Sequence, residues 1–212
     1  ITARQVCVKN GVYENRVNLF MAIITFSAIV FFSGLRSSGG DTLAYIQKFN
    51  QYPIWNDMYE YIKNLGGREP GFIIFSVLIK TYITQDYQVW LFIIASISGI
   101  CIMYPLYKYS CNYGVSVFLF MASCQFTWLL NGIRQFLVAS IIFACTPLIL
   151  NKKPIPYIII ILILSTFHKS ALIMILAYFI VDSEPWSKRT MLVVWGIILI
   201  MLFTSTFTSL LD

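Results

Sequence analysis

Long apolar stretches without a single charge limit what this chain can fold into. Val17–Leu35 and Thr190–Leu211 each come close to or exceed the roughly 20 residues that a helix needs to cross hydrocarbon. Hydrophobic residues make up 58% of the chain and charged residues only 11%, whereas about 25% of a soluble domain is charged. The sequence therefore predicts an all-α fold, a polytopic transmembrane helical bundle.

Eight segments are candidate membrane spans. They are Val17–Leu35, Pro70–Thr84, Tyr87–Tyr107, Tyr113–Leu130, Gln135–Leu150, Ile155–Phe167, Ser170–Val181 and Thr190–Leu211. The second, sixth and seventh are short for a bilayer. We expect residues 1–212 to form a single transmembrane domain, as a fragment of a longer polytopic protein, because the chain begins with Ile1 and stops just after an apolar run.

The one long connection, Arg36–Glu69, has helical patterns of its own. Apolar residues recur there at helical spacing opposite polar ones: Trp55, Met58, Tyr59 and Ile62 against Asn56, Asp57, Glu60 and Lys63. Such a pattern favours an amphipathic helix in the membrane interface. Asp41 is placed to cap a second short helix that runs to about Asn50, and Gly66-Gly67 breaks the pattern. We therefore expect two juxtamembrane helices in the first long external loop.

Basic residues predict which segments face the same side of the membrane. They gather before the first span and in two later turns, at Lys9, Arg16, Lys152, Lys153, Lys188 and Arg189. If these are cytoplasmic, three other polar segments face outward: Arg36–Glu69, Asn131–Arg134 and His168-Lys169. The number of predicted spans between Leu35 and Arg134 is then odd, although two segments on the same side of the membrane require an even number. This conflict is resolved if Pro70–Thr84 is a re-entrant or incompletely crossing helix.

Several classes of function lack their usual sequence signals. The basic residues are spread over short turns, so they form no nucleic-acid patch. The five cysteines are scattered without metal-type spacing. There is no D-x-D or Asp-Asp pair, no H-E-x-x-H, no G-x-S-x-G and no P-loop. We expect no metal and no cofactor.

The segment from Gly34 to Tyr45 places an arginine, an aspartate and a tyrosine where a membrane helix meets water. Polar residues at that depth are costly unless they serve a function. Arg36 is either an arginine snorkelling at a helix end or a bidentate ligand for phosphate. Asp41 is a helix cap, or a general base or substrate ligand, with Tyr45 one helical turn later.

Three further polar sites interrupt the apolar stretches. Glu69 precedes Pro70 at the start of an apolar segment, where an acid also suits the helix dipole. Asn131, Arg134 and Gln135 either form a polar turn or supply a second phosphate-binding arginine, with Asn131 and Gln135 on one helix face. His168, the single histidine, is either solvated at a turn or able to transfer a proton or bind a phosphoryl oxygen, with the charge of Lys169 beside it.

These residues resemble those of the EpsG-like, Wzy-type family of bacterial polysaccharide polymerases. The matching motifs are Gly34-Leu35-Arg36 with Gly40-Asp41 and Tyr45, Glu69-Pro70-Gly71-Phe72, Asn131-Gly132-Ile133-Arg134-Gln135 and Phe167-His168-Lys169-Ser170-Ala171. They stand in the family's order, each at a membrane boundary. The resemblance implies a multi-pass protein of the bacterial inner membrane, related to the GT-C glycosyltransferases, that uses polyprenyl-linked sugars at the outer face.

The hypothesis that follows is glycosyl transfer without a metal. A hydroxyl of an incoming lipid-linked repeat unit attacks the anomeric carbon of a glycan on undecaprenyl diphosphate, and the diphosphate lipid leaves. Arg36 and Arg134 would hold the diphosphate, Asp41 or His168 would be the base, with Asp41 slightly preferred, and the sugar would lie on substrate-binding residues. These are Tyr45, Glu69, Asn131, Gln135 and Lys169.

Two other functions stay open at this point. A flippase or exporter of lipid-linked glycans also needs arginines for a diphosphate, although no inverted repeat is evident. A membrane O-acyltransferase would use His168 but leaves both arginines unexplained. The expected partners are the lipid-linked glycan, the lipid bilayer and other proteins of polysaccharide assembly and export.

Overall fold

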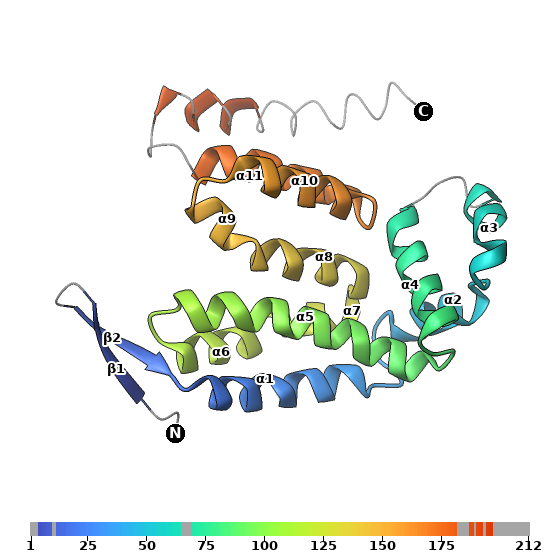
Figure 1. Ribbon diagram of the computed structural model, residues 1–212, viewed down its shortest axis with the longest axis horizontal. Coiled ribbons are helices and arrows are strands. Elements are labelled where there is room, and N and C mark those ends of the chain that lie inside the picture. The colour runs from blue at the N-terminus through green and yellow to red at the C-terminus, as the bar shows by residue number, and fades with distance from the viewer. Residues whose placement is uncertain are drawn as a thin grey trace.

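The computed structural model describes residues 4–9, 12–64 and 69–181, and the short pieces 187–188, 190–192 and 194–196. Side chains are described from residue 18 onward. The predicted break at Gly66-Gly67 and most of the predicted span Thr190–Leu211 lie outside these residues. From Asn18 onward every described element is helical, as the composition predicts for a membrane bundle (Figure 1).

The elements follow one another in a simple order. Strands β1 (Arg4–Lys9) and β2 (Val12–Val17) pair antiparallel, which the sequence did not predict. The helices of the first half are α1 (Leu19–Gly34), α2 (Thr42–Gln51), η1 (Trp55–Asp57), α3 (Met58–Asn64), α4 (Pro70–Tyr82) and α5 (Tyr87–Tyr109). Those of the second half are α6 (Tyr113–Ala122), α7 (Cys124–Asn131), α8 (Ile133–Ala144), α9 (Thr146–Leu150), α10 (Pro154–Ser165), η2 (Lys169–Leu172) and α11 (Ile173–Val181).

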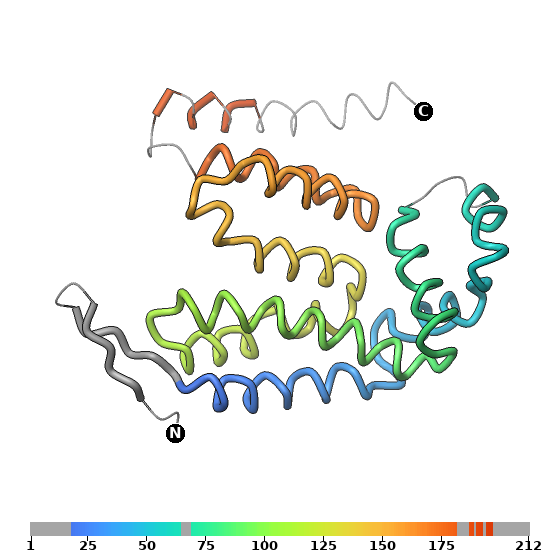
Figure 2. The backbone as a smooth tube through the Cα atoms, in the orientation of Figure 1, coloured from blue at the N-terminus to red at the C-terminus, as the bar shows by residue number. Residues whose placement is uncertain are grey.

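The long helices lie side by side, and the chain crosses the molecule several times to form them. Figure 2 shows α1, α5, α8 and α10 running back and forth across the molecule. Helix α5 packs along α1 on one side and along α8 on the other. Its Trp90, fully buried, and its Ile94 form part of the main apolar core. Burial of large apolar side chains between these helices holds the bundle together.

Among the described residues, two helical segments are long and apolar enough to cross a membrane by themselves. They are α5 and the continuous segment Ile133–Leu150 formed by α8 and α9. The predicted span Tyr113–Leu130 is not one straight helix: α6 and α7 are bent by 60° at Ser123. Ser123 ends α6 and its hydroxyl accepts from Gln125 N–H as the cap of α7. A polar cap inside an apolar run therefore starts a new helix.

Helix α4 is not a straight span. It has 13 residues and belongs to the apolar helices too short to pass as spans, and Figure 1 shows it lying across the ends of the other helices. Lys80 donates hydrogen bonds to the carbonyls of Phe49, Asn50 and Tyr52, at 2.9, 2.8 and 2.6 Å. An ammonium group at the carbonyl end of α2 complements its dipole, so this lysine joins α4 to α2.

Helices occur in both parts of Arg36–Glu69 where the pattern predicts them. Helix α2 covers Thr42–Gln51, and η1 with α3 covers Trp55–Asn64. Asp41 precedes α2, but its side chain makes no capping hydrogen bond, so the predicted capping role is wrong. Phe49 of α2 stacks on Trp90 with ring centroids 4.6 Å apart, which anchors the loop helices on the bundle.

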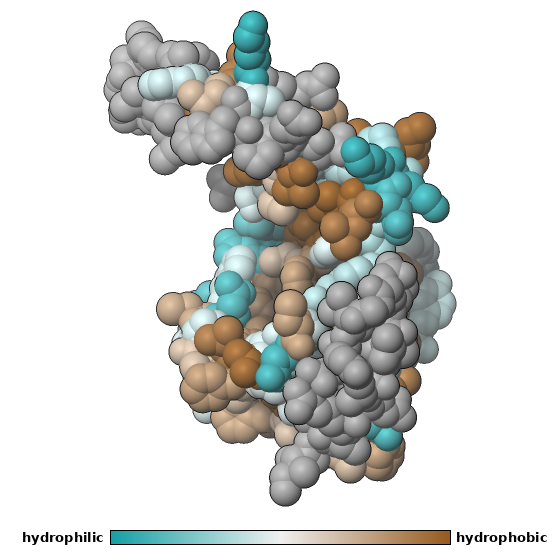
Figure 3. Space-filling model, turned by 90° about the vertical axis from the view of Figure 1, so that its left-hand side faces the viewer, coloured by the Kyte–Doolittle hydropathy of each residue, from teal (hydrophilic) through white to brown (hydrophobic). Residues whose placement is uncertain are grey.

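The outer surface is rich in large apolar side chains. Phe20, Phe32 and Phe118 are each more than 60% exposed, and many other large apolar side chains along the helices are exposed to a smaller extent. Figure 3 looks onto the end of the bundle far from α2–α4, where apolar and hydrophilic groups lie next to one another. An apolar exterior of this extent suits a surrounding of lipid rather than water.

The polar segments gather at the opposite end, on the right of Figure 1. The described parts of Arg36–Glu69, the α7–α8 junction at Gly132 and the loop from Thr166 to η2 all lie there. We call this end of the bundle the polar end. Helix α4 lies across the bundle and does not carry the chain to the other end, so all three segments lie at one end. The distribution of basic residues likewise predicts that these segments face the same side of the membrane.

Candidate functional site

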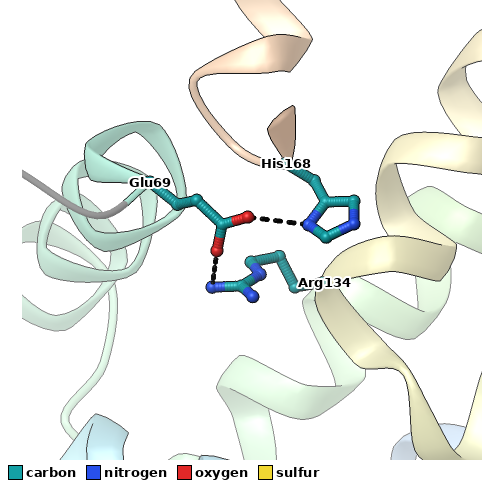
Figure 4. Close-up of polar contacts among 3 residues, drawn as sticks. All are labelled: Glu69, Arg134 and His168. Carbon is teal, nitrogen blue, oxygen red and sulfur yellow. Dashed lines mark hydrogen bonds and ion pairs between the residues drawn. The ribbon is translucent and has the colours of Figure 1, made fainter. Parts of the chain in front are cut away.

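A carboxylate joined to two basic groups stands at the centre of the polar end (Figure 4). Glu69 forms an ion pair through its Oε2 with Nη1 of Arg134. Its other oxygen, Oε1, lies 2.8 Å from Nδ1 of His168. The side chains of Glu69, His168 and Arg134 are 14%, 19% and 29% exposed. Partial burial weakens solvent screening, so the pairing holds all three side chains in place.

Close approach of two chain segments brings Glu69 to His168. The N–H of Gly71, at the start of α4, donates to the carbonyl of Thr166 at 3.0 Å. A Cβ at Gly71 would lie only 2.7 Å from Cδ2 of Phe167 and would also meet the hydroxyl of Thr166. Phe75 packs on Phe167, with ring centroids 6.0 Å apart. Glycine is therefore needed where the Glu-Pro-Gly-Phe segment meets the loop that carries His168.

Glu69 itself has an unusual backbone conformation. Its φ of 50° and ψ of 59° lie in the left-handed region, which costs a residue with a Cβ on the order of 1 kcal/mol. Pro70 follows as the first residue of α4, and its fixed φ suits that position. The turn directs the Glu69 side chain towards Arg134 and His168 (Figure 4). Strain of this kind often accompanies a functional site.

Arg134 comes from the first turn of α8, directly after the break at Gly132. Helix α7 ends at Asn131 and α8 begins at Ile133, so Asn131 and Gln135 belong to different helices and do not share a face as predicted. Nε of Arg134 is buried and has no hydrogen-bond partner among the described residues. Arg134 thus has one buried donor that the described residues leave unsatisfied.

A polar cavity of about 770 Å³ opens on one side of the ion-paired cluster. Its lining comes from α2, α3, α4 and α8: Tyr45, Lys48, Gln51, Tyr52, Tyr61, Asn64, Glu69, Phe72, Ile73 and Arg134. Burial raises the pKa of Tyr52 to about 12 and that of Tyr45 above its ordinary value. Both phenols therefore stay protonated near neutral pH and can donate hydrogen bonds. The cavity can hold a polar ligand with aromatic contacts.

An apolar cavity of about 630 Å³ lies on the other side of the cluster. His168 belongs to its wall, with Trp128 of α7 and Gln135 of α8. The remaining wall is mainly apolar: Val138, Ala139, Ile142, Phe143, Thr146, Ile149, Ser170, Ala171 and Met174. His168 thus faces one cavity and bonds to Glu69, which faces the other.

Arg36 lies at the polar end but outside the cluster. Its Nε donates to Thr42 Oγ1 at 2.9 Å, and its Nη1 donates to the carbonyl of Ser33 at 2.7 Å. Burial lowers the pKa of Arg36 to about 10, so it remains a cation at neutral pH. These bonds tie the end of α1 to the start of α2, which is next to Asp41.

The other predicted site residues occupy different positions around the polar end. Asp41 is exposed, and its charge acts on Tyr45 in the polar cavity. Asn131 packs against Gly40, where a Cβ would meet its side-chain amide. Gln135 lines the apolar cavity, and Lys169 is exposed at the start of η2.

Some cavity residues were not predicted from the sequence. Lys48, Gln51, Tyr61 and Asn64 join Tyr45 in the polar cavity. The signal that could have found them is the spacing of Tyr45, Lys48 and Tyr52, which places all three on one face of α2. The partners across the cavity, on α3, could not be read from that spacing.

Fold and site together define a helical membrane protein with a charged cluster between a polar and an apolar cavity at one end of its bundle. A family model described as EpsG family matches residues 19–212, and the chain belongs to this family. Membership supports a role in polysaccharide biosynthesis, with a lipid-linked glycan in a membrane as the kind of substrate. Neither the comparison with curated proteins nor that with solved structures finds a match.

Proposed function

We propose that this protein is a polysaccharide polymerase, a GT-C-like membrane glycosyltransferase. It joins oligosaccharide repeat units carried on undecaprenyl diphosphate at the outer face of the bacterial inner membrane. The observation that carries this proposal is the pairing of Arg134 and His168 with Glu69, between a polar and an apolar cavity. A diphosphate that links a sugar to a lipid is the ligand such a position suits.

The reaction needs cations where negative charge develops. The acceptor's hydroxyl oxygen bonds to the anomeric carbon of the donor glycan, and the bond from that carbon to the diphosphate oxygen breaks. Its electron pair leaves with the lipid diphosphate. Arg134 and His168 stabilise this leaving group, and Glu69 holds both in position. The chain itself supplies the positive charge, so transfer proceeds without a metal ion.

The base that accepts the hydroxyl proton is Asp41. Its side chain is not used to cap α2, and its charge acts on Tyr45 at the polar cavity, from which a sugar would approach. Arg36 acts here as a positioning residue, because its bonds to Ser33 and Thr42 fix the start of α2.

Substitution of Arg134 tests this proposal. Removing one charge stabiliser costs on the order of 100-fold in rate, so Arg134→Ala should produce single lipid-linked units at the outer face and almost no polymer. Arg134→Lys, which keeps the charge but loses the bidentate geometry, should retain part of the activity. Polymer length is measured on gels and unit accumulation by mass spectrometry.

A matched control removes a cation at the other end of the bundle. Lys108 is an exposed residue near the end of α5, where it contacts Tyr104, and Lys108→Ala should leave polymer length unchanged. Full-length polymer in Arg134→Ala at normal expression would overturn the proposal. Accumulation of units on the inner face would instead indicate a flippase.

A further inference from the structure

The cavities on the two sides of the cluster differ in chemical character. The polar one is lined by tyrosines and by amide and charged groups of α2 and α3. The apolar one is lined mainly by aliphatic and aromatic side chains of α8, α9 and α11. Glu69 and Arg134 face the first and His168 faces the second, while one hydrogen bond of 2.8 Å connects Glu69 with His168. The charged cluster therefore lies between a polar cavity and an apolar cavity.

The apolar cavity lies along a helix that can span the membrane. Val138, Ile142 and Ile149 all belong to its wall and to the segment Ile133–Leu150. From His168 and Gln135 at the polar end, the wall continues along α8 to Thr146 and Ile149 in α9. A mainly apolar cavity along a helix that is long and apolar enough to cross a membrane favours an apolar chain as its occupant.

The order of chemical groups in the donor indicates whether the apolar cavity would hold the lipid of the donor or that of the acceptor. In a lipid-linked glycan the diphosphate joins the anomeric carbon directly to the first isoprene unit. The lipid of the donor thus begins two phosphates away from the bond that breaks, whereas the lipid of the acceptor is a whole repeat unit away from the attacking hydroxyl. An apolar chain next to the diphosphate cations must belong to the donor.

We propose that the apolar cavity along α8 binds the first isoprene units of the donor's polyprenyl chain, with its diphosphate on His168 and Arg134 and its sugars in the tyrosine-lined cavity. This inference rests on the proposed function for the identity of the donor. Beyond the proposed function, it states that the donor lies with its lipid in the apolar cavity and its sugars in the tyrosine-lined cavity, and it assigns a lipid subsite. It also assigns sugar contacts to Lys48, Gln51 and Tyr61.

Photoaffinity labelling tests the lipid subsite without requiring turnover. The probe is farnesyl diphosphate carrying a benzophenone at its far end, applied to the full chain in nanodiscs. Labelled peptides should map to α8, α9 or α11, and undecaprenyl diphosphate should compete. A phosphatidylglycerol analogue with the same benzophenone should give far weaker labelling there, because it lacks a diphosphate.

Filling the cavity provides a second measurement. Ala139, half-buried in its wall, is changed to Phe, which should lower probe labelling of α8 at least 10-fold. Ala28→Phe introduces the same side chain at an exposed position of α1 and should leave labelling unchanged. Chromatographic elution as a monodisperse peak shows that each variant is folded.

The outcomes separate this inference from the proposed function. Equal labelling by the phosphatidylglycerol probe, or undiminished labelling in folded Ala139→Phe, would overturn the lipid subsite even if the protein polymerises glycan. Specific labelling together with full-length polymer in Arg134→Ala would leave the lipid diphosphate site standing and remove the polymerase assignment.

Discussion

At the scale of single residues, Glu69 binds two basic side chains that come from separate parts of the chain. His168 is 99 residues away in sequence, and Arg134 lies on a third segment. Each oxygen of the carboxylate accepts from one of them. Loss of the carboxylate would leave two partly buried basic groups without their partner, and they would no longer be held towards the same point.

We expect Glu69→Gln to reduce polymerisation at least 10-fold and to destabilise the protein by about 1–3 kcal/mol, because an amide cannot pair with both basic groups. Both effects can be measured, by polymer yield in cells and by thermal unfolding in detergent. Asp57→Asn serves as control, since this acid is exposed in η1. Unchanged polymer in Glu69→Gln would show that the cluster is not part of the site.

His168 can be tested for the atom that it offers to the substrate. In His168→Asn the amide nitrogen takes the place of Nδ1 and can still donate to Glu69, while nothing replaces Nε2. We expect normal thermal stability but a loss of polymer of about 100-fold, as for other charge stabilisers. His168→Gln, which places its amide nitrogen near Nε2, should recover part of the activity. Full activity of His168→Asn would restrict His168 to holding Glu69.

At the scale of elements, the site depends on how α4 meets the end of α10. The contact is close because Gly71 has no side chain: its N–H bonds to Thr166, and a Cβ would clash with Phe167. The same helix is held at its other end by Lys80, through the carbonyls of α2. Helix α4 therefore positions Glu69 on one side and supports the polar cavity on the other.

We expect Gly71→Ala to separate Glu69 from His168 and to lower both activity and stability. Overpacking of this kind costs about 1–3 kcal/mol, and the polymer should be markedly shorter. Gly114→Ala is the matched control, because the nearest side-chain atom to a Cβ there is 3.6 Å away. If Gly71→Ala kept normal stability and polymer length, close contact between α4 and α10 would not be required.

At the scale of the whole molecule, the bundle sorts its polar segments to one end. Helix α4 lies across the bundle, so the helices that run along it bring α2, the α7–α8 junction and η2 together (Figure 1). The turns at Cys111 and at Lys152-Lys153 lie at the other end. Because Lys and Arg tend to concentrate on the cytoplasmic side, we predict that the polar end faces outside.

Cysteine labelling from outside the cell checks this arrangement. With the other cysteines replaced, Lys169→Cys at an exposed position of η2 should react with a membrane-impermeant maleimide in intact spheroplasts. The exposed native Cys111, kept alone in a second variant, should react only after the membrane is permeabilised. The reverse pattern would place the candidate site in the cytoplasm and exclude transfer at the outer face.

Local patterns in the amino-acid sequence predicted the class of fold and the places where polar residues interrupt the apolar stretches. Long uncharged runs predict membrane helices because hydrophobic transfer depends mainly on composition and length, which are local properties. The amphipathic pattern at 55–63 likewise predicted η1 and α3. The same reasoning singled out Arg134 and His168, because polar residues stand out within apolar stretches.

The way in which these residues combine follows from tertiary packing. The pairing of Glu69 with Arg134 and His168, the break at Ser123 and the two cavities all depend on how closely distant segments approach one another. Those distances follow from helix packing and from the missing side chain at Gly71, neither of which a local pattern encodes. The side chain of Asp41 gives the converse case: its position before α2 was predicted, but whether its carboxylate bonds to the backbone depended on the three-dimensional arrangement.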